Sequence, residues 1–315
     1  MTLTELKYIV AVAREKHFGH AAEACFVAQP TLSVAIKKLE DELGVTLFER
    51  GGSEISMTPL GVQIVAQAER VLEQTAAIKE IAKQNKDPLV GPFRLGIIYT
   101  IAPYLLPALV KAMIDRVPQM PLVLQENFTV KLLEQLRQGE IDAAIVALPF
   151  PDQGLLVQAV YDEPFVVAVP KLHPWADRKN VTTNDLKSET MLLLGNGHCF
   201  RDQVLEVCPE MSRFSTSGDG IARTFEGSSL ETIRHMVASG IGITVLPQAS
   251  VPDMNATDGM LRYIPFEQPG PSRRVVLVWR KSFTRGVAIE EVRQALLSCE
   301  LPGATMLPNE PSSEA

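Results

Sequence analysis

Cysteine is scarce in this chain. Its 315 residues include only four cysteines, at Cys25, Cys199, Cys208 and Cys299. Four are too few for a disulfide scaffold, so a small secreted fold held together by disulfides is excluded. In a reducing compartment, any disulfide between these residues is expected to be transient rather than structural.

Long apolar runs and an excess of positive charge are also missing. No run of 18 or more apolar residues occurs, which argues against a membrane-spanning helix. Lys and Arg number 30 against 37 Asp and Glu, a net charge of −7, so the chain does not coat nucleic acid through bulk charge. The first residues form no basic leader with an apolar run behind it, so we expect a cytoplasmic protein without membrane contact.

Length and composition favour a folded protein with more than one domain. At about 150 residues per domain, the length suggests two or three compact units. Hydrophobic residues make up 46% and charged residues 21% of the chain, which is typical of soluble globular proteins. Wholesale disorder and collagen-like or coiled-coil compositions are therefore excluded.

The first 50 residues carry three helical patterns. Apolar residues recur at helical spacing over 3–13 and 18–25, and a third stripe repeats over 32–43. Pro30 suits the first turn of the third helix, and Gly44 is expected to cap its end. Two short helices, a tight turn and a solvent-facing third helix predict a helix-turn-helix.

Polar residues on this third helix are the candidate DNA contacts. They are Gln29, Pro30, Thr31, Ser33, Lys37 and Lys38, with Arg50 at the start of the next loop. Such residues can reach base edges in the major groove and phosphates, although a solvated helix face is the alternative for any one of them. Residues 1–90 hold 10 Lys and Arg against 12 Asp and Glu. Binding must then rely on placed contacts, helix N-termini and paired copies.

Four segments of this region resemble the DNA-binding domain of the LysR-type transcriptional regulators. They are FGHAA at 18–22, QPTLS at 29–33, IKKLE at 36–40 and LGVTLFER at 43–50. The resemblance implies a winged helix-turn-helix over 1–58, with the wing at 50–57. It also implies a linker helix from Pro59, and an apolar stripe at helical spacing continues to residue 81. That stripe can pack on its own domain or pair with a second copy, and the resemblance favours pairing over 59–91.

Strand and helix patterns alternate from Phe93 onward. Strands are predicted at 94–98, 122–127 and 141–148, and helices at 103–117 and 129–138. This order indicates a parallel βαβαβ sheet. A second alternation covers 165–246, and a strand at 274–279 with a helix at 287–299 returns to the first lobe.

The predicted fold class is α/β, with an α-rich winged helix-turn-helix ahead of a two-lobed effector domain. The resemblance implies that this domain, at 92–301, is similar to periplasmic binding proteins and has mixed, mainly parallel sheets. Lobe I is assigned to about 92–162 and 268–301, and lobe II to about 163–267. The tail at 302–315 is rich in Pro, Ser and Glu and is expected to be disordered.

The segment GNGHCFRDQVLEVC at 195–208 places two cysteines between a predicted strand and a predicted helix. A thiol near a helix N-terminus is favoured as the thiolate, and neighbouring Arg201 and His198 act in the same direction. Cys199 is therefore a candidate reactive thiol. Two unrelated buried cysteines are the alternative for such a pair.

The spacing of the pair has a mechanical consequence. On one regular helix, Cys199 and Cys208 would be about 13 Å apart along the axis. A disulfide needs Cα atoms within about 7 Å of each other. If both cysteines lie on the predicted helix, oxidation to a disulfide requires the helix to unwind.

The two-cysteine segment resembles the redox segment of the hydrogen-peroxide sensors within the LysR family. The resemblance implies that hydrogen peroxide oxidises Cys199 to a sulfenic acid, and that Cys208 resolves it as a disulfide. It gives His198 and Asp202 roles in hydrogen bonding or proton transfer.

Two threonines match the positions that hold peroxide or its water in those sensors. They are Thr100 and Thr129, at the ends of the first two effector-domain strands. On sequence alone, both are equally well explained as helix N-caps.

The implied function is a redox-sensing transcription regulator and not an enzyme. Its implied partners are double-stranded promoter DNA, hydrogen peroxide, RNA polymerase and a dithiol reductant such as glutaredoxin, and its implied assembly is a homodimer and a homotetramer. No cofactor is expected, and no metal, because His198, Cys199 and Cys208 lack a fourth ligand at a familiar spacing. Cys25 and Cys299 are expected to be packing thiols.

Two other functions stay open on the sequence. One is a LysR-type regulator that senses a small metabolite between its lobes. The other is a thiol peroxidase that carries a DNA-binding domain, although no second redox motif such as C-x-x-C is present.

Overall fold

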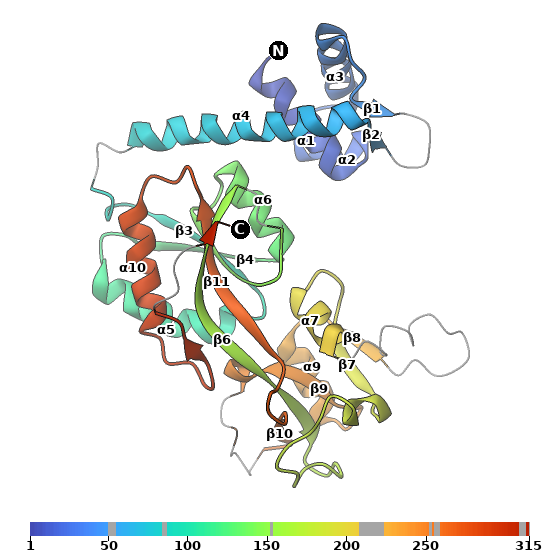
Figure 1. The fold of residues 1–315 in the computed structure, drawn as a ribbon, viewed down its shortest axis with the longest axis vertical. Coiled ribbons are helices and arrows are strands. Elements are labelled where there is room, and N and C mark those ends of the chain that lie inside the picture. The colour runs from blue at the N-terminus through green and yellow to red at the C-terminus, as the bar shows by residue number, and fades with distance from the viewer. Residues whose placement is uncertain are drawn as a thin grey trace. The chain divides into compact units, whose positions relative to one another are not determined.

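A computed structural model describes residues 1–49, 55–83, 87–151, 154–207, 224–251, 254, 259–308 and 313–314. The chain divides into two compact units, with the boundary at 85–86. Figure 1 labels their helices and strands. Two of the predicted site residues, Arg50 and Cys208, lie outside the described residues.

The first unit is a winged helix-turn-helix, as predicted. Its elements are α1 (Leu3–Glu15), α2 (Phe18–Ala24), α3 (Gln29–Leu43), β1 (Phe48–Glu49), β2 (Ser56–Met57) and α4 (Pro59–Lys83). β1 and β2 pair antiparallel, with Phe48 opposite Met57. The apolar stripes predicted from the sequence form the core, with Ile9, Leu32 and Ile36 fully buried.

Local signals in the sequence explain where these helices begin and end. Thr2 caps α1, because its hydroxyl accepts the N–H of Glu5 and the carboxylate of Glu5 accepts the N–H of Thr2. α3 begins at Gln29 with a proline in its first turn and ends at Gly44, which has a φ of +69°. The carboxylate of Glu40 accepts the N–H of Leu47 at 2.7 Å and so ties α3 to the strand that follows.

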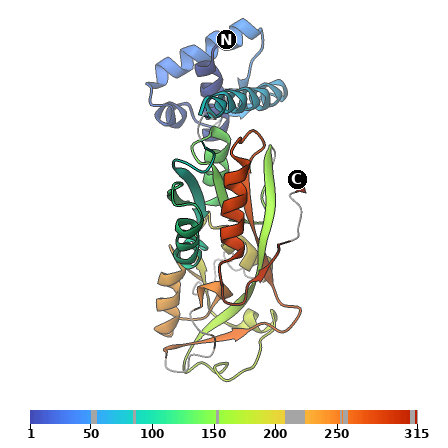
Figure 2. The same ribbon diagram turned by 90° about the vertical axis from the view of Figure 1, so that its left-hand side faces the viewer.

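The second unit begins with the predicted βαβαβ pattern. Its first elements are β3 (Phe93–Ile98), α5 (Ala102–Arg116), β4 (Leu122–Asn127), α6 (Thr129–Gln138) and β5 (Ala143–Ala147). β3 pairs in parallel with both β4 and β5, so β3 lies between them. Figure 2 shows α5 beside α10 (Gly286–Leu297).

One long strand continues through both lobes of the second unit. β6 (Leu155–Pro170) pairs antiparallel with β11 (Ser272–Arg280) along its first part, and with β9 (Thr244–Pro247) and β10 (Leu261–Pro265) along its second part. β11 also pairs antiparallel with β5. The sheets are mixed as expected. Among the strands of the described residues, β3 pairs in parallel with β4 and β5, and β7 with β8, while the pairs of β6 and β11 are antiparallel, so the sheets are not mainly parallel.

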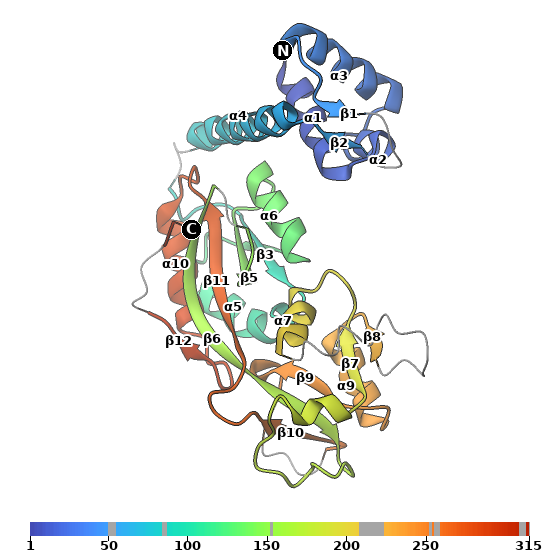
Figure 3. The ribbon, with the colours of Figure 1, turned by 45° about the vertical axis from the view of Figure 1, so that its right-hand side comes forward.

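The second lobe also contains six shorter elements. They are η1 (Asp185–Ser188), β7 (Met191–Leu194), α7 (Cys199–Val207), β8 (Thr224–Gly227), α9 (Leu230–Ala238) and η2 (Gln248–Ser250). β7 and β8 pair in parallel, and Figure 3 shows α7 beside β7. The alternation of strands and helices expected over 165–246 is confirmed by β7, α7, β8, α9 and β9.

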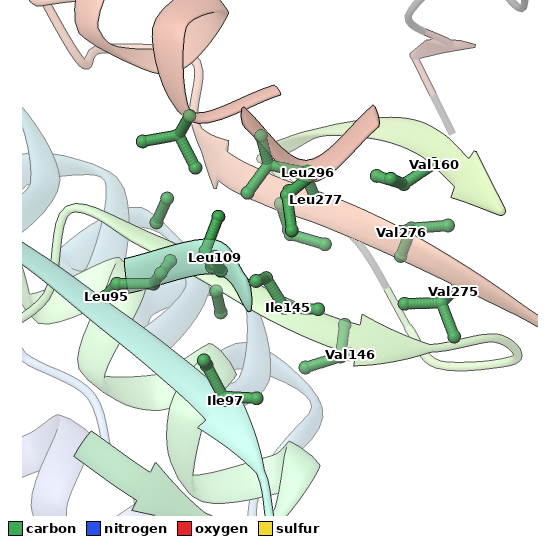
Figure 4. Packing of buried hydrophobic residues seen from close by; sticks show 14 of the residues in the cluster. Leu95, Ile97, Leu109, Ile145, Val146, Val160, Val275, Val276, Leu277 and Leu296 are labelled. Atoms are coloured by element: carbon green, nitrogen blue, oxygen red, sulfur yellow. The ribbon is translucent and has the colours of Figure 1, made fainter. Parts of the chain in front are cut away.

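Each lobe has its own hydrophobic core. In the first, side chains of β3, β5 and β11 pack with α5 and α10, as Leu95, Ile145, Leu277 and Leu296 do in Figure 4. The second core gathers apolar side chains from β6, β7, α7, α9 and β9. β6 contributes to both, with Val160 in the first core and Val166 in the second.

The expectation of a disordered tail is wrong for residues 302–308. β12 (Thr305–Met306) pairs antiparallel with β6, and the N–H of Leu307 donates to the carbonyl of Val160 at 2.8 Å. Met306 and Leu307 also pack on the first core. The polar composition misled the prediction because an edge of β6 offers backbone partners to a strand of any composition.

No helix in the part of the chain that the structure describes has the length and apolar character needed to cross a membrane.

We predict that truncation after Leu301 destabilises the second unit. The loss of the β12 pairing, the packing of Leu307 and the bond from Arg293 to the carbonyl of Pro308 should lower the free energy of unfolding by about 2 kcal/mol. Truncation after Pro308, which keeps β12, is the matched control and should cost clearly less. Urea denaturation measures both, and equal losses would contradict the prediction.

Candidate functional site

The outer face of α3 presents the predicted DNA contacts. Leu32, Ile36 and Leu39 are fully buried and fix the orientation of the helix. Consequently the polar residues on its other side face solvent: Gln29, Pro30, Thr31, Lys37 and Lys38 are exposed, and Ser33 is half-buried. Five of the seven predicted residues are thus available to a partner, one is partly available, and Arg50 lies outside the described residues.

The two lysines differ in their surroundings. The ammonium group of Lys38 lies 3.8 Å from the carboxylate of Glu5, which caps α1. Lys37 is exposed and makes no ion pair within the described residues. Lys37 is therefore the better placed of the two for an external phosphate.

Cys199 is the first residue of α7, in the second unit. The turn before it contains Gly197, whose φ of +95° favours glycine. The thiol is free and half-buried, and it packs against the core of the first lobe, whereas the next residue, Phe200, belongs to the core of the second. The thiol therefore lies where the two lobes meet, at a helix end with positive partial charge.

A small cavity opens beside this thiol. It has room for about one water-sized molecule. Its lining comes from three chain segments: Ile98, Tyr99 and Thr100; Asn127, Phe128 and Thr129; and Gly197, His198 and Cys199. The structure thus brings four of the predicted sensor residues, the two threonines, His198 and Cys199, around one space.

The hydroxyls of the two threonines that line this cavity differ in their hydrogen bonding. The Thr129 hydroxyl is buried and has no hydrogen-bond partner within the described residues. The Thr100 hydroxyl accepts a hydrogen bond from Arg273 at 2.9 Å and can still donate its own proton. The N-cap explanation fails for both, because the N-cap of α5 is Ile101 and the Thr129 hydroxyl caps nothing. A buried hydroxyl without a partner is uncommon and points to a polar ligand or water.

Arg273 is a site residue that the sequence analysis missed. Its guanidinium is buried and binds the Glu163 carboxylate at 2.7 Å, and the hydroxyl and carbonyl of Thr100 at 2.9 and 3.1 Å. Burial works against the charge, but Glu163 outweighs it and the pKa of Arg273 is raised, with a smaller contribution from the negative form of Cys199. Arg273 therefore carries a buried positive charge at the junction of the lobes and holds Thr100 in place.

His198 is held as a neutral side chain. Burial lowers the pKa of its imidazole, and a hydrogen bond to the backbone of Ser228 opposes this only in part. The ring packs against Phe128, with centroids 4.9 Å apart, and against Tyr99 at 5.9 Å. His198 is thus a wall of the cavity and, near neutral pH, not a second positive charge.

The remaining predicted residues of α7 point elsewhere. Arg201 donates to the carbonyl of Leu194 and pairs with Glu226, both at 2.8 Å. Asp202 is exposed and does not line the cavity. Arg201 and Asp202 do not line the cavity, and the predicted help of Arg201 to the thiol stays a prediction.

Gln203 was also missed by the sequence analysis. It is buried, and its amide donates to the carbonyl of Leu148 in the first lobe at 2.7 Å. This bond ties α7 across the junction of the lobes, one turn beyond Cys199.

The other described cysteines are poor nucleophiles. Burial raises the pKa of Cys299 to about 11, and its thiol donates to the carbonyl of Ala295. Burial also raises the pKa of Cys25, which lies at the end of α2. Since thiolates are the reactive form, Cys199 is the best candidate among the three described cysteines.

The site suits the binding of a small polar molecule next to a thiol. Two threonine side chains with hydroxyl groups line the cavity beside the thiol, and the cavity excludes anything large. No cluster of three His, Cys, Asp or Glu side chains that could hold a metal occurs in the described ranges.

Two protein families match the chain. The family described as "LysR substrate binding domain" matches residues 86–298, and the one described as "Bacterial regulatory helix-turn-helix protein, lysR family" matches residues 3–62. The matches fall on the two compact units separately, with only a short overlap of the second into α4.

Curated relatives and solved structures are similar over nearly the whole chain. A hydrogen peroxide-inducible genes activator from Dickeya chrysanthemi is 41% identical over 280 residues, 89% of this chain and 90% of that protein. Full-length OxyR from Pseudomonas aeruginosa, solved as a cysteine-to-aspartate variant, is 48% identical, with 99% of both chains covered and a TM-score of 0.66. A cysteine-to-serine mutant of Corynebacterium glutamicum OxyR with H2O2 bound is 33% identical, with 94% and 91% covered and a TM-score of 0.61.

We predict that the Arg273–Glu163 pair is required for a stable second unit. Arg273→Met leaves the Glu163 charge buried without its partner and should cost about 3–5 kcal/mol of unfolding free energy. The double variant with Glu163→Gln removes both charges and should recover part of this loss.

The neighbouring pair Arg274–Asp162 is the matched control, since its partners are 2.8 Å apart but partly exposed. Arg274→Met should therefore cost less than about 1 kcal/mol. Urea denaturation of the three variants would contradict the prediction if Arg273→Met and Arg274→Met cost the same.

Proposed function

Since the chain belongs to the LysR family of bacterial transcription regulators, we propose that it senses hydrogen peroxide through Cys199 and responds by changing its action on promoter DNA. One observation carries this proposal. The buried Thr129 hydroxyl, which has no partner within the described residues, lines the same small cavity as the free Cys199 thiol. Peroxide has two oxygens that can accept from the hydroxyls of Thr100 and Thr129.

The names of similar proteins support the same oxidant. Relatives that are about as long as this chain are hydrogen peroxide-inducible genes activators, and one solved relative holds H2O2. The size of the cavity counts against a metabolite bound at this place, because it has room for about one water-sized molecule.

The first chemical step is attack of the Cys199 thiolate on one peroxide oxygen. A sulfur–oxygen bond forms, the oxygen–oxygen bond breaks, and the other oxygen leaves as hydroxide and takes a proton to become water. The sulfur is oxidised to a sulfenic acid while the peroxide is reduced. Arg273 supports the negative charge of the attacking sulfur, and the threonine hydroxyls orient the peroxide.

In the second step the Cys208 thiol attacks the sulfenic sulfur. A disulfide forms and water leaves. A disulfide joining Cys199 and Cys208 is incompatible with an intact α7. Along this helix Cys199 and Val207 are about 12 Å apart, and Cys208 is one peptide, about 3.8 Å, further on. Its Cα atom therefore stays at least about 8 Å from that of Cys199, beyond the reach of about 7 Å.

Loss of α7 is the proposed link between oxidation and regulation. The helix is anchored in both lobes, by Phe200 in the second core and by the bond from Gln203 to Leu148 in the first lobe. Breaking it refolds this part of the effector domain and changes how the subunits of a homotetramer are arranged on DNA. Promoter activation through RNA polymerase follows, and a dithiol reductant such as glutaredoxin resets the disulfide.

The domain roles follow the same scheme. Residues 1–58 bind promoter DNA in the cytoplasm, 59–91 form the dimerisation helix and hinge, and 92–301 sense the oxidant. We assign contacts with base edges to Gln29, Pro30, Thr31 and Ser33. We assign contacts with phosphates to Lys37, Lys38 and Arg50.

We predict that Cys199→Ser abolishes the reaction with stoichiometric peroxide. Cys208→Ser should leave a sulfenic acid on Cys199 that a dimedone probe traps, because attack no longer leads to a disulfide. Peptide mapping by mass spectrometry measures both. Cys25→Ser and Cys299→Ser are controls and should react as the wild type does.

Thr129→Val, which keeps the shape but removes the hydroxyl, should slow sulfenic acid formation about tenfold if the hydroxyl orients peroxide.

In the cysteine variants, dimedone labelling of Cys208 instead of Cys199 would refute the assignment of the two cysteines.

We predict that Lys37→Ala weakens binding to DNA at every sequence and reduces the slope of log K against log salt by about 1, as expected for one phosphate contact per subunit. Lys38→Ala is the comparison and should change the slope less, because its ammonium group lies near Glu5. Fluorescence anisotropy at several salt concentrations gives both slopes. An unchanged slope for Lys37→Ala would mean that this lysine only meets solvent.

A further inference from the structure

Two aromatic side chains form part of the cavity wall beside Cys199. Tyr99 and Phe128 are 39% and 36% exposed, and their ring centroids are 5.3 Å apart at an interplanar angle of 74°. Both rings also pack on the ring of His198. Three rings therefore meet edge to face on the side of the cavity that is partly open to solvent.

Each aromatic residue directly precedes a cavity hydroxyl in the chain. Tyr99 and Thr100 follow β3, and Phe128 and Thr129 lie where β4 ends and α6 begins. At both places the threonine is buried while the ring is partly exposed. Of the residues that line the cavity, the two rings are therefore the ones more accessible from solvent than the threonines.

Two contacts define the surroundings of Phe128. Its own N–H donates to the side chain of Asn127 at 3.0 Å. Across the lobe junction, a Cβ placed on Gly197 would lie 3.3 Å from two atoms of the Phe128 ring. The ring therefore rests directly on the turn that leads into Cys199, and no space is left between them.

We propose that Tyr99 and Phe128 form an aromatic cover that restricts the oxidants of Cys199 to hydrogen peroxide and excludes hydroperoxides with bulky substituents. The proposal rests on the proposed function and adds the residues that choose among oxidants. Hydrogen peroxide carries only hydrogen on each oxygen and fits beneath the rings. An alkyl hydroperoxide undergoes the same step, with an S–O bond formed, the O–O bond broken and an alcohol released, but its alkyl group must occupy the space of the rings.

The test compares two oxidants on full-length reduced protein. Rate constants for sulfenic acid formation on Cys199 are measured with hydrogen peroxide and with tert-butyl hydroperoxide, by dimedone labelling and mass spectrometry. Phe128→Ala should raise the ratio of the tert-butyl rate to the peroxide rate by about tenfold or more, the range in which a pocket discriminates by size. Phe128→Tyr keeps the ring and should leave the ratio near that of the wild type.

A neighbouring residue provides the matched control. Val130 is two residues along the same segment, is 79% exposed and does not line the cavity. Val130→Ala should leave the ratio unchanged. If Phe128→Ala fails to fold, Tyr99→Ala is the second test variant. Phe128→Trp, which enlarges the ring, is expected to lower the ratio of the tert-butyl rate to the peroxide rate.

The outcomes separate this inference from the proposed function. If wild-type Cys199 does not react with hydrogen peroxide, both are overturned. If it reacts, but the ratio of rates is the same in the wild type, Phe128→Ala and Tyr99→Ala, the aromatic cover is overturned and the peroxide sensor stands. A ratio that rises equally in Val130→Ala would also overturn the cover, since the effect would then be a general loosening of the segment.

Discussion

The buried ion pair between Arg273 and Glu163 is the interaction on which the rest of the effector domain depends. The two residues lie on β11 and β6 at the junction of the lobes, and both side chains are only 1% exposed. The guanidinium also binds the hydroxyl and carbonyl of Thr100, which follows the end of a third strand. Burial of this charge is tolerable only because Glu163 and Thr100 satisfy it, so the same contacts stabilise the junction and hold a residue that lines the cavity beside Cys199.

The thiol site is formed by elements that are far apart in the sequence but lie together at the junction of the lobes. Two parallel strands end at the cavity, and α7 begins there from the other lobe. A helix N-terminus, two hydroxyls and a guanidinium meet at this place without a metal-binding cluster among the described residues. The geometry favours oxidation of the sulfur by a small oxygen donor. In our proposal, the surrounding rings restrict which donors reach the thiol.

Local sequence patterns were sufficient to predict most of the helices and strands. The βαβαβ unit, the three N-terminal helices and the start of α7 follow from periodicity and caps, which depend on neighbours within a few residues. The first half of β6 was missed because Asp162, Glu163 and Pro164 interrupt its apolar run. Arg273 was missed because its burial depends on a partner 110 residues away. Tyr99 and Phe128 gave no signal, since only the packing of two lobes shows that both rings meet His198.

β6 also limits how the effector domain can move. This 16-residue strand is hydrogen-bonded to β11 in one lobe and to β9 and β10 in the other, so the lobes share a continuous backbone ladder and not a loose hinge. Opening and closing of the lobes as rigid shells would have to shear that ladder. A change that begins at Cys199 is therefore confined more easily to α7, a helix of nine residues, than spread over a movement of whole lobes.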